Sequence, residues 1–214
     1  MKPILICISF LLFISPETGF SQTDQTDIKK GNLFIYGEAG VGKSAYSVPK
    51  VALNCIWKNN IVSIAYQYAS RDAPNVPSDY IKPLIVILSD GQPRQHVSTY
   101  SFMYGKVLFT KHPGLRYVLR GGFSAGNVQT PDNYKNVPNG WFPYSTYTYN
   151  YQPAVGFIID PSIELPFGAG FGVSFDVFAN INSGSSYAGI GGNLIFGKVR
   201  NRVRRNRINK HLPQ

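Results

Sequence analysis

Residues 170–180 alternate apolar and polar side chains with a period of two. The apolar members are Phe171, Val173, Phe175, Val177 and Ala179, and small or polar residues separate them, with Phe178 as the one exception. Strict alternation predicts a β-strand with one apolar face and one polar face. A soluble sandwich can contain such strands, and so can a membrane barrel, whose outside meets lipid and whose inside is polar.

The same pattern predicts eight strands, at 33–41, 48–58, 60–70, 97–110, 114–125, 149–165, 168–180 and 185–198. Tight turns fall at 58–60, 111–114 and 166–168, whereas the connections 72–95 and 126–148 are long and rich in Pro, Asn and Asp. Outer-membrane barrels combine an even strand number with short periplasmic turns and longer external loops. The sequence therefore predicts an all-β, eight-stranded antiparallel up-and-down transmembrane β-barrel with two long external loops.

The composition fits this architecture. Aromatic residues make up 14% of the chain and charged residues 15%, compared with about 25% charged residues in an ordinary soluble domain. No run of about 20 apolar residues is present, so the sequence predicts no membrane helix. A secreted soluble lipid-binding barrel remains the alternative at this point.

The N-terminus has the features of an export signal. Lys2 precedes a short apolar run at 4–14, and Gly19-Phe20-Ser21 places small residues before a cleavage site at Gln22. We therefore predict a signal peptide at 1–21, a linker at 22–31, a barrel domain at 32–198 and a basic tail at 199–214. Cleavage leaves Cys55 as the one cysteine, so no internal disulfide is expected.

The formal net charge of +10 is concentrated at the C-terminus, because seven basic residues and no acidic one lie in 198–210. In an exported protein such a tail favours anionic lipid headgroups or lipopolysaccharide phosphate over nucleic acid. A solvated tail without a partner is the other interpretation.

The polar faces of the predicted strands contain charged residues of both signs. A narrow barrel is filled by its own side chains, and paired charges suit that interior because a lone buried charge is costly. The interior could act as a polar conduit or gate, or as a structural plug of ion pairs. The fourth strand is ambiguous, because Tyr100, Phe102 and Tyr104 fit either face. The predicted interior charges are Glu38, Arg116, Arg120, Asp160, Glu164 and Asp176.

Over residues 33–198 this pattern resembles small bacterial outer-membrane barrels, the eight-stranded class typified by the OmpA transmembrane domain and OmpX-like proteins. The Gly- and aromatic-rich style is also similar to uncharacterised barrels of Bacteroidetes-type Gram-negative bacteria. The resemblance implies an outer-membrane location and a structural, porin-like or surface-interaction role without catalysis. It also implies delivery by the barrel assembly machinery, with Gly191, Leu194 and Phe196 as the assembly signal. The basic tail departs from barrels that end at the aromatic residue.

Residues 37–44 match the phosphate-loop pattern G-x-x-x-x-G-K-[ST]. A phosphate loop must open a helix whose N-terminus holds the phosphates, but Pro49 would break such a helix. We interpret the match as a chance event in a glycine-rich strand, with a nucleotide-binding protein as the alternative.

His96 and Ser98 lie at the predicted outer rim in a His-x-Ser arrangement. This pair resembles that of outer-membrane lipid A deacylases, in which the serine attacks an acyl ester and the histidine is the base. The small residues that follow the pair in that family are replaced here by Thr99 and Tyr100. A rim acyl hydrolase is therefore kept as an alternative. The main prediction is a protein without enzyme activity, cofactor or metal site. The apolar run 84–88 has no assigned role.

Overall fold

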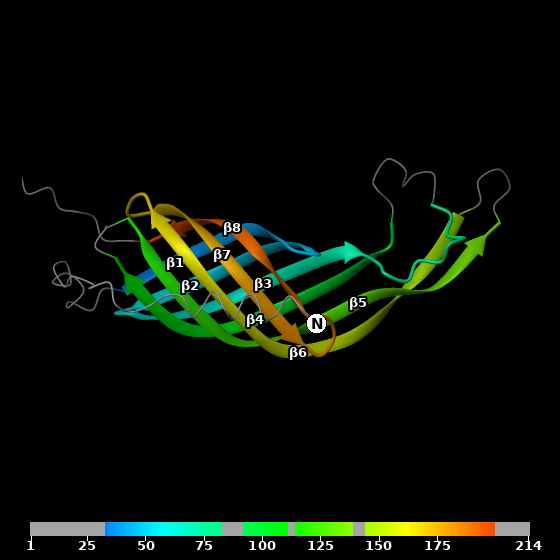
Figure 1. The fold of residues 1–214 in the computed structure, drawn as a ribbon, viewed down its shortest axis with the longest axis horizontal. Coiled ribbons are helices and arrows are strands. Elements are labelled where there is room, and N and C mark those ends of the chain that lie inside the picture. The colour runs from blue at the N-terminus through cyan, green and yellow to red at the C-terminus, as the bar shows by residue number, and fades with distance from the viewer. Residues whose placement is uncertain (1–32, 83–91, 111–113, 139–143, 200–214) are drawn as a thin grey trace, which may run out of the picture.

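The computed structural model describes residues 33–82, 92–110, 114–138 and 144–199. Eight antiparallel strands are paired in chain order, and the pairing of β1 with β8 closes the sheet into a barrel (Figure 1). The prediction of an all-β, eight-stranded antiparallel up-and-down barrel is confirmed. No helix in this part of the chain is long and apolar enough to cross a membrane. The strands are β1 Leu33–Lys43, β2 Ser47–Trp57, β3 Asn60–Asp72, β4 Arg94–Phe109, β5 Arg116–Val137, β6 Tyr144–Pro166, β7 Phe171–Asn182 and β8 Tyr187–Gly197.

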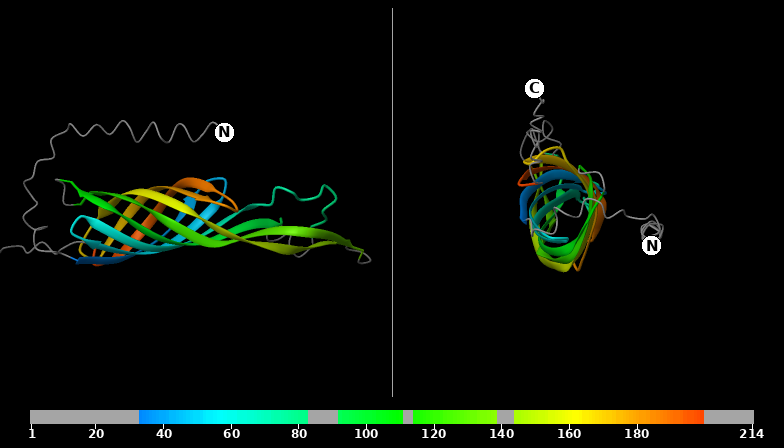
Figure 2. Two further views of the ribbon diagram at one scale, coloured as in Figure 1. Left: turned by 90° about the horizontal axis from the view of Figure 1, so that it is seen from below. Right: turned by 90° about the vertical axis from the view of Figure 1, so that its left-hand side faces the viewer.

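The second of the two predicted long loops is mostly strand. β5 and β6 continue through 126–137 and 144–148 and stay paired up to Val137 and Tyr144, with one irregularity between Asp132 and Lys135. This paired extension projects well beyond the rest of the barrel (Figure 2). Most of the extension has neither lipid on one face nor the packed barrel interior on the other. Its strands therefore carry no apolar–polar alternation, and the prediction of a loop was wrong.

The connections at the opposite end of the barrel are short. Trp57 pairs with Asn60 across a two-residue turn, in which Lys58 has a positive φ of 54°. Four residues join β6 to β7. We call this end the turn end and the other the extension end. The predicted turn at 111–114 falls largely outside the described residues, as do the apolar run 84–88, the signal peptide and most of the tail.

The distribution of side chains is the reverse of that in a soluble domain. Every strand exposes large apolar residues, and we call this outer surface the apolar belt. The ambiguity of the fourth strand is resolved, because Tyr100, Phe102 and Tyr104 point outward with exposed fractions of 66%, 57% and 54%. One belt residue from each strand, in chain order, is Ile35, Leu53, Ile64, Phe102, Phe123, Phe157, Phe175 and Leu194.

The interior is layered along the barrel axis. Both ends of the barrel are filled by buried, mainly apolar side chains. Charged and amide side chains occupy the strand positions between them, together with a small apolar cluster of Ala65, Met103 and Ile158. The turn-end layer consists of Phe34, Tyr36, Ile56, Ile61, Val107, Val118, Ile195 and Val199. The extension-end layer consists of Tyr46, Val48, Ala69, Val97, Val128, Ala154, Phe178 and Tyr187.

Candidate functional site

The central feature of the interior is a five-residue ion network, which we call the ionic layer. Lys50 Nζ lies 2.9 Å from Glu38 Oε1 and 3.2 Å from Asp160 Oδ2, and it also contacts Asp176. Arg120 Nη2 lies 2.9 Å from Glu38 Oε2 and 3.0 Å from Asp160 Oδ2. All five side chains are buried. Two cations therefore hold three carboxylates together across the barrel.

Amide side chains complete the ionic layer. Asn54 accepts a hydrogen bond from Arg120 Nη1 (2.7 Å) and donates one to Glu38 Oε2 (3.1 Å). Asn193 donates to Asp176 Oδ2 at 3.1 Å. Buried charges are tolerated only when ion pairs and hydrogen bonds replace their lost hydration. The network therefore fills the central layer and offsets most of its charge, with two cations facing three carboxylates.

A second ion pair lies closer to the turn end. Arg116 Nε donates to Glu164 Oε2 at 2.6 Å, and the Tyr36 hydroxyl donates to Glu164 Oε1 at 2.8 Å. Arg116 Nη1 also donates to the backbone carbonyl of Val199 at 2.8 Å. This contact anchors the chain just after β8 to the interior of the barrel.

The structure places Glu38, Arg116, Arg120, Asp160, Glu164 and Asp176 inside the barrel, in two neighbouring ion clusters. The sequence analysis missed Lys50, which makes more ion pairs than any of these six residues among the described residues. Its inward orientation could have been predicted from the sequence, because Lys50 and Asn54 alternate with the outward Val51 and Leu53. Gly191 faces the interior beside Asp176, whereas Leu194 and Phe196 lie in the apolar belt. Their role as an assembly signal stays a prediction.

The phosphate-loop pattern lies in extended backbone. Residues 37–43 belong to β1 and pair with β2 on one side and β8 on the other. Because these residues pair with a strand on each side, their successive backbone N–H groups cannot all point at one phosphate. A short turn to β2 follows them, where a phosphate loop would be followed by a helix. Lys43 is exposed on the outside of the barrel.

The His96–Ser98 pair lacks the arrangement of a catalytic dyad. His96 Nδ1 lies 2.7 Å from the Tyr68 hydroxyl, and its Nε2 lies 3.5 Å from the Tyr149 hydroxyl. No hydrogen bond joins His96 to Ser98, nor His96 to a carboxylate, among the residues that the structure describes. The same part of the chain holds no group of three or more metal-ligating side chains.

These contacts make His96 part of a chain of aromatic rings that runs from the barrel wall onto the extension. Consecutive ring centroids are 5.2, 5.9, 5.5, 5.8 and 5.8 Å apart, within the range of favourable aromatic pairs. Burial raises the pKa of Tyr80 and of Tyr134 above the usual tyrosine value. The aromatic chain consists of Tyr68, His96, Tyr149, Tyr147, Tyr134 and Tyr80.

The segment after β3 supports the extension. Ser145 N donates to the Ile81 carbonyl at 2.9 Å, and Ile81 N donates to Ser145 Oγ at 2.8 Å. Asn136 Nδ2 donates to Asp79 Oδ2 at 3.0 Å. An isolated two-stranded hairpin is only marginally stable in water, so this third segment helps to hold the extension in one shape.

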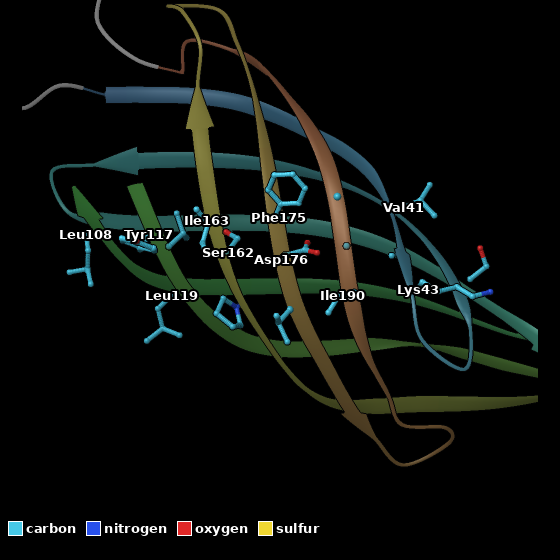
Figure 3. Close-up of a pocket in the computed structure, with 17 residues that line it drawn as sticks. Val41, Lys43, Leu108, Tyr117, Leu119, Ser162, Ile163, Phe175, Asp176 and Ile190 are labelled. Carbon is cyan, nitrogen blue, oxygen red and sulfur yellow. The ribbon is translucent and has the colours of Figure 1, made fainter. Parts of the chain in front are cut away.

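The outer wall also carries a groove of about 1040 Å³. It crosses strands β4 to β8 and β1 and reaches the start of β2 at Ser47, and Figure 3 shows Lys43 at its extension end and Leu108 at its turn end. Its sides are belt residues such as Tyr117, Phe175 and Ile190, so the groove opens on the apolar surface rather than into the interior.

A closed antiparallel barrel with an apolar exterior and an ion-paired interior defines the class of transmembrane β-barrels. No family model matches the sequence, and no curated protein matches it. Several solved structures are similar in fold, among them the following two. The N-terminal β-barrel domain of Pseudomonas aeruginosa OprF is 13% identical, with a TM-score of 0.49, over 78% of this chain and 97% of that one. The attachment invasion locus protein Ail of Yersinia pestis is 8% identical, with a TM-score of 0.43, over 77% and 95%.

Proposed function

We propose that this protein is an integral outer-membrane β-barrel with a structural and surface-interaction role and no catalytic activity. The apolar belt is the observation that carries the proposal. Monomeric soluble proteins rarely expose contiguous apolar patches larger than a few hundred Å², whereas here all eight strands expose large apolar side chains. Lipid is the environment that such a surface requires, and a closed barrel leaves no strand edge unpaired in it.

The layered interior supports a role without steady ion conduction. A conducting barrel needs a continuous wet path, but the ionic layer lies between two layers of buried, mainly apolar side chains. An ion in transit would have to displace residues such as Ile56 and Ile61, whose exposed fractions are 0%. The ionic layer acts in this proposal as a structural plug.

The extension is the part of the molecule best suited to contact other molecules. It stands clear of the apolar belt, carries the part of the aromatic chain formed by Tyr134 and Tyr147, and is supported by the segment after β3. Tyrosine supplies large contact area at low cost in conformational entropy, together with a hydroxyl that can donate or accept a hydrogen bond.

Two further partners belong to this proposal. The barrel assembly machinery would recognise the last strand through Gly191, Leu194 and Phe196. Anionic lipid or lipopolysaccharide would bind the basic tail, of which 200–214 lie outside the described residues.

Heat-modifiability tests the membrane barrel directly. Protein from isolated outer membranes is run on a detergent gel with and without boiling. We expect membrane fractionation together with a mobility shift, because a closed barrel resists detergent until it is heated. A soluble protein without a shift would contradict the proposal and favour a secreted lipid-binding barrel.

Topology is tested by labelling single cysteines with a membrane-impermeant maleimide. In a Cys55→Ser background, Asn136→Cys in the extension should react in intact cells. Lys58→Cys, in the β2–β3 turn at the opposite end, should react only after the periplasm is opened. Both sites are exposed in the folded protein, so a reversed result would mean that the barrel is inserted with the opposite orientation.

A further inference from the structure

Gly192 lines the groove on the outer wall and adds no side chain to fill it. Gly192 faces outward between Phe175 of β7 and Val41 of β1, its two neighbours in the sheet. A Cβ atom placed at Gly192 would meet no atom within 4 Å. A side chain would fit there, and glycine instead leaves a depression in an otherwise bulky apolar surface. The volume of about 1040 Å³ is at the upper end of the usual range for ligand pockets.

The position of the groove restricts what can occupy it. Its sides belong to the apolar belt, so under the proposed membrane location it opens onto the hydrocarbon region of the bilayer. Water does not reach a ligand site there, and an apolar chain fills it without losing hydrogen bonds. An acyl chain is therefore the chemical group that fits along its length.

The extension end of the groove adds a polar feature. Lys43 and Ser47 face each other across the β1–β2 hairpin, and both line the groove. The structure shows no carboxylate within ion-pair distance of Lys43 among its described residues. An ammonium and a hydroxyl at this edge match a phosphate-bearing headgroup placed at the membrane surface, above an acyl chain in the groove.

We propose that the groove is a specific lipid site, which holds one acyl chain along Gly192 and the lipid's phosphate at Lys43 and Ser47. The proposal rests on the membrane location given under "Proposed function". It is separate from lipid binding by the basic tail, because it uses residues of β1, β2 and β8. Glycine at position 192 is the residue that makes room for the chain.

Native mass spectrometry of the full-length mature barrel tests this site. The barrel is released from vesicles of equal parts phosphatidylglycerol and phosphatidylcholine, and the retained lipid is identified. We expect one phosphatidylglycerol per barrel in the wild type and its loss in Gly192→Leu, which fills the groove. Ala188→Leu, an outward substitution on the same strand outside the groove, should retain the lipid. Lys43→Gln should weaken retention about fivefold, as expected for one cation at a membrane surface, whereas Lys58→Gln at the turn end should not.

The outcomes separate this site from the membrane barrel itself. The wild type and all variants should show the heat-induced mobility shift. A wild type without the shift would contradict the proposed membrane barrel itself, not the lipid site alone. Equal lipid retention by Gly192→Leu and Ala188→Leu would overturn the site. So would a dimer in the wild type that Gly192→Leu dissociates, because a second copy would then occupy the groove.

Discussion

Arg120→Leu is expected to destabilise the folded barrel by about 3–5 kcal/mol, the cost of leaving buried charges without their partner. Arg120 is fully buried, pairs with Glu38 and Asp160, and donates to Asn54. Leucine fills part of the space but leaves Lys50 as the one cation of the ionic layer facing three carboxylates. The measurement is the urea dependence of the heat-induced gel shift for barrels folded in lipid vesicles.

Two controls isolate the contribution of the buried charge. Arg94→Leu removes an exposed arginine that lies 3.7 Å from Asp72 and should change stability by less than about 1 kcal/mol. Adding Asp160→Asn to Arg120→Leu removes one of the carboxylates that has lost its arginine partner, and it should recover part of the lost stability. If Arg120→Leu were as mild as Arg94→Leu, the ionic layer would not be the element that holds the interior together.

Phe157→Arg should destabilise the membrane-inserted barrel by about 2–4 kcal/mol, as for arginine on the lipid face near the bilayer midplane. Phe157 is 59% exposed in the structure and packs against outward-facing Phe123, with ring centroids 5.0 Å apart and the rings tilted by 45°. An exposed phenylalanine on a soluble protein would tolerate the same change, since the arginine side chain would remain hydrated there. The result therefore separates a surface that faces lipid from one that faces solvent.

Asn150→Arg is the matched control for Phe157→Arg. Asn150 is exposed on the same strand, β6, but lies at the base of the extension, where it pairs with Thr130. Its substitution should leave the urea midpoint nearly unchanged. Equal effects at the two positions would show that depth in the membrane does not determine the cost, and the assignment of the apolar belt would be wrong.

The sequence predicted the strands wherever one face of a strand meets lipid and the other meets the packed interior. That contrast produces the alternation of Phe171–Ala179 and of the other seven strands. It disappears in the part of the extension beyond Gln129, where β5 no longer pairs with β4. The faces of β5 and β6 there do not separate an outer surface from the barrel interior, and a paired hairpin there has the composition of a loop. Pairing above the membrane depends on contacts such as Ser145 with Ile81, which join residues distant in sequence.

The sequence predicted that charged side chains fill the interior, but not which layers they form or which charges pair. Alternation identifies inward charges, yet it does not show which of them meet, because Glu38 and Arg120 are 82 positions apart. Phe178 illustrates the same limit. It interrupts the polar face of β7 in the sequence, and the structure explains it as a buried member of the extension-end layer.

The pairing of charges within the ionic layer has a consequence for how the barrel forms. The β1–β2 hairpin carries its own ion pair, Lys50 with Glu38, and neighbouring β5 and β6 carry Arg120 with Asp160. Asp176 on β7 differs, because its cationic partner, Lys50, lies on β2. In a sheet whose β1 and β8 have not yet paired, β7 is five strands away from β2, so closing that seam brings Asp176 to its counter-ion. Closure is thus coupled to charge compensation, and a partly closed sheet would hold a stranded anion that disfavours its persistence in the bilayer.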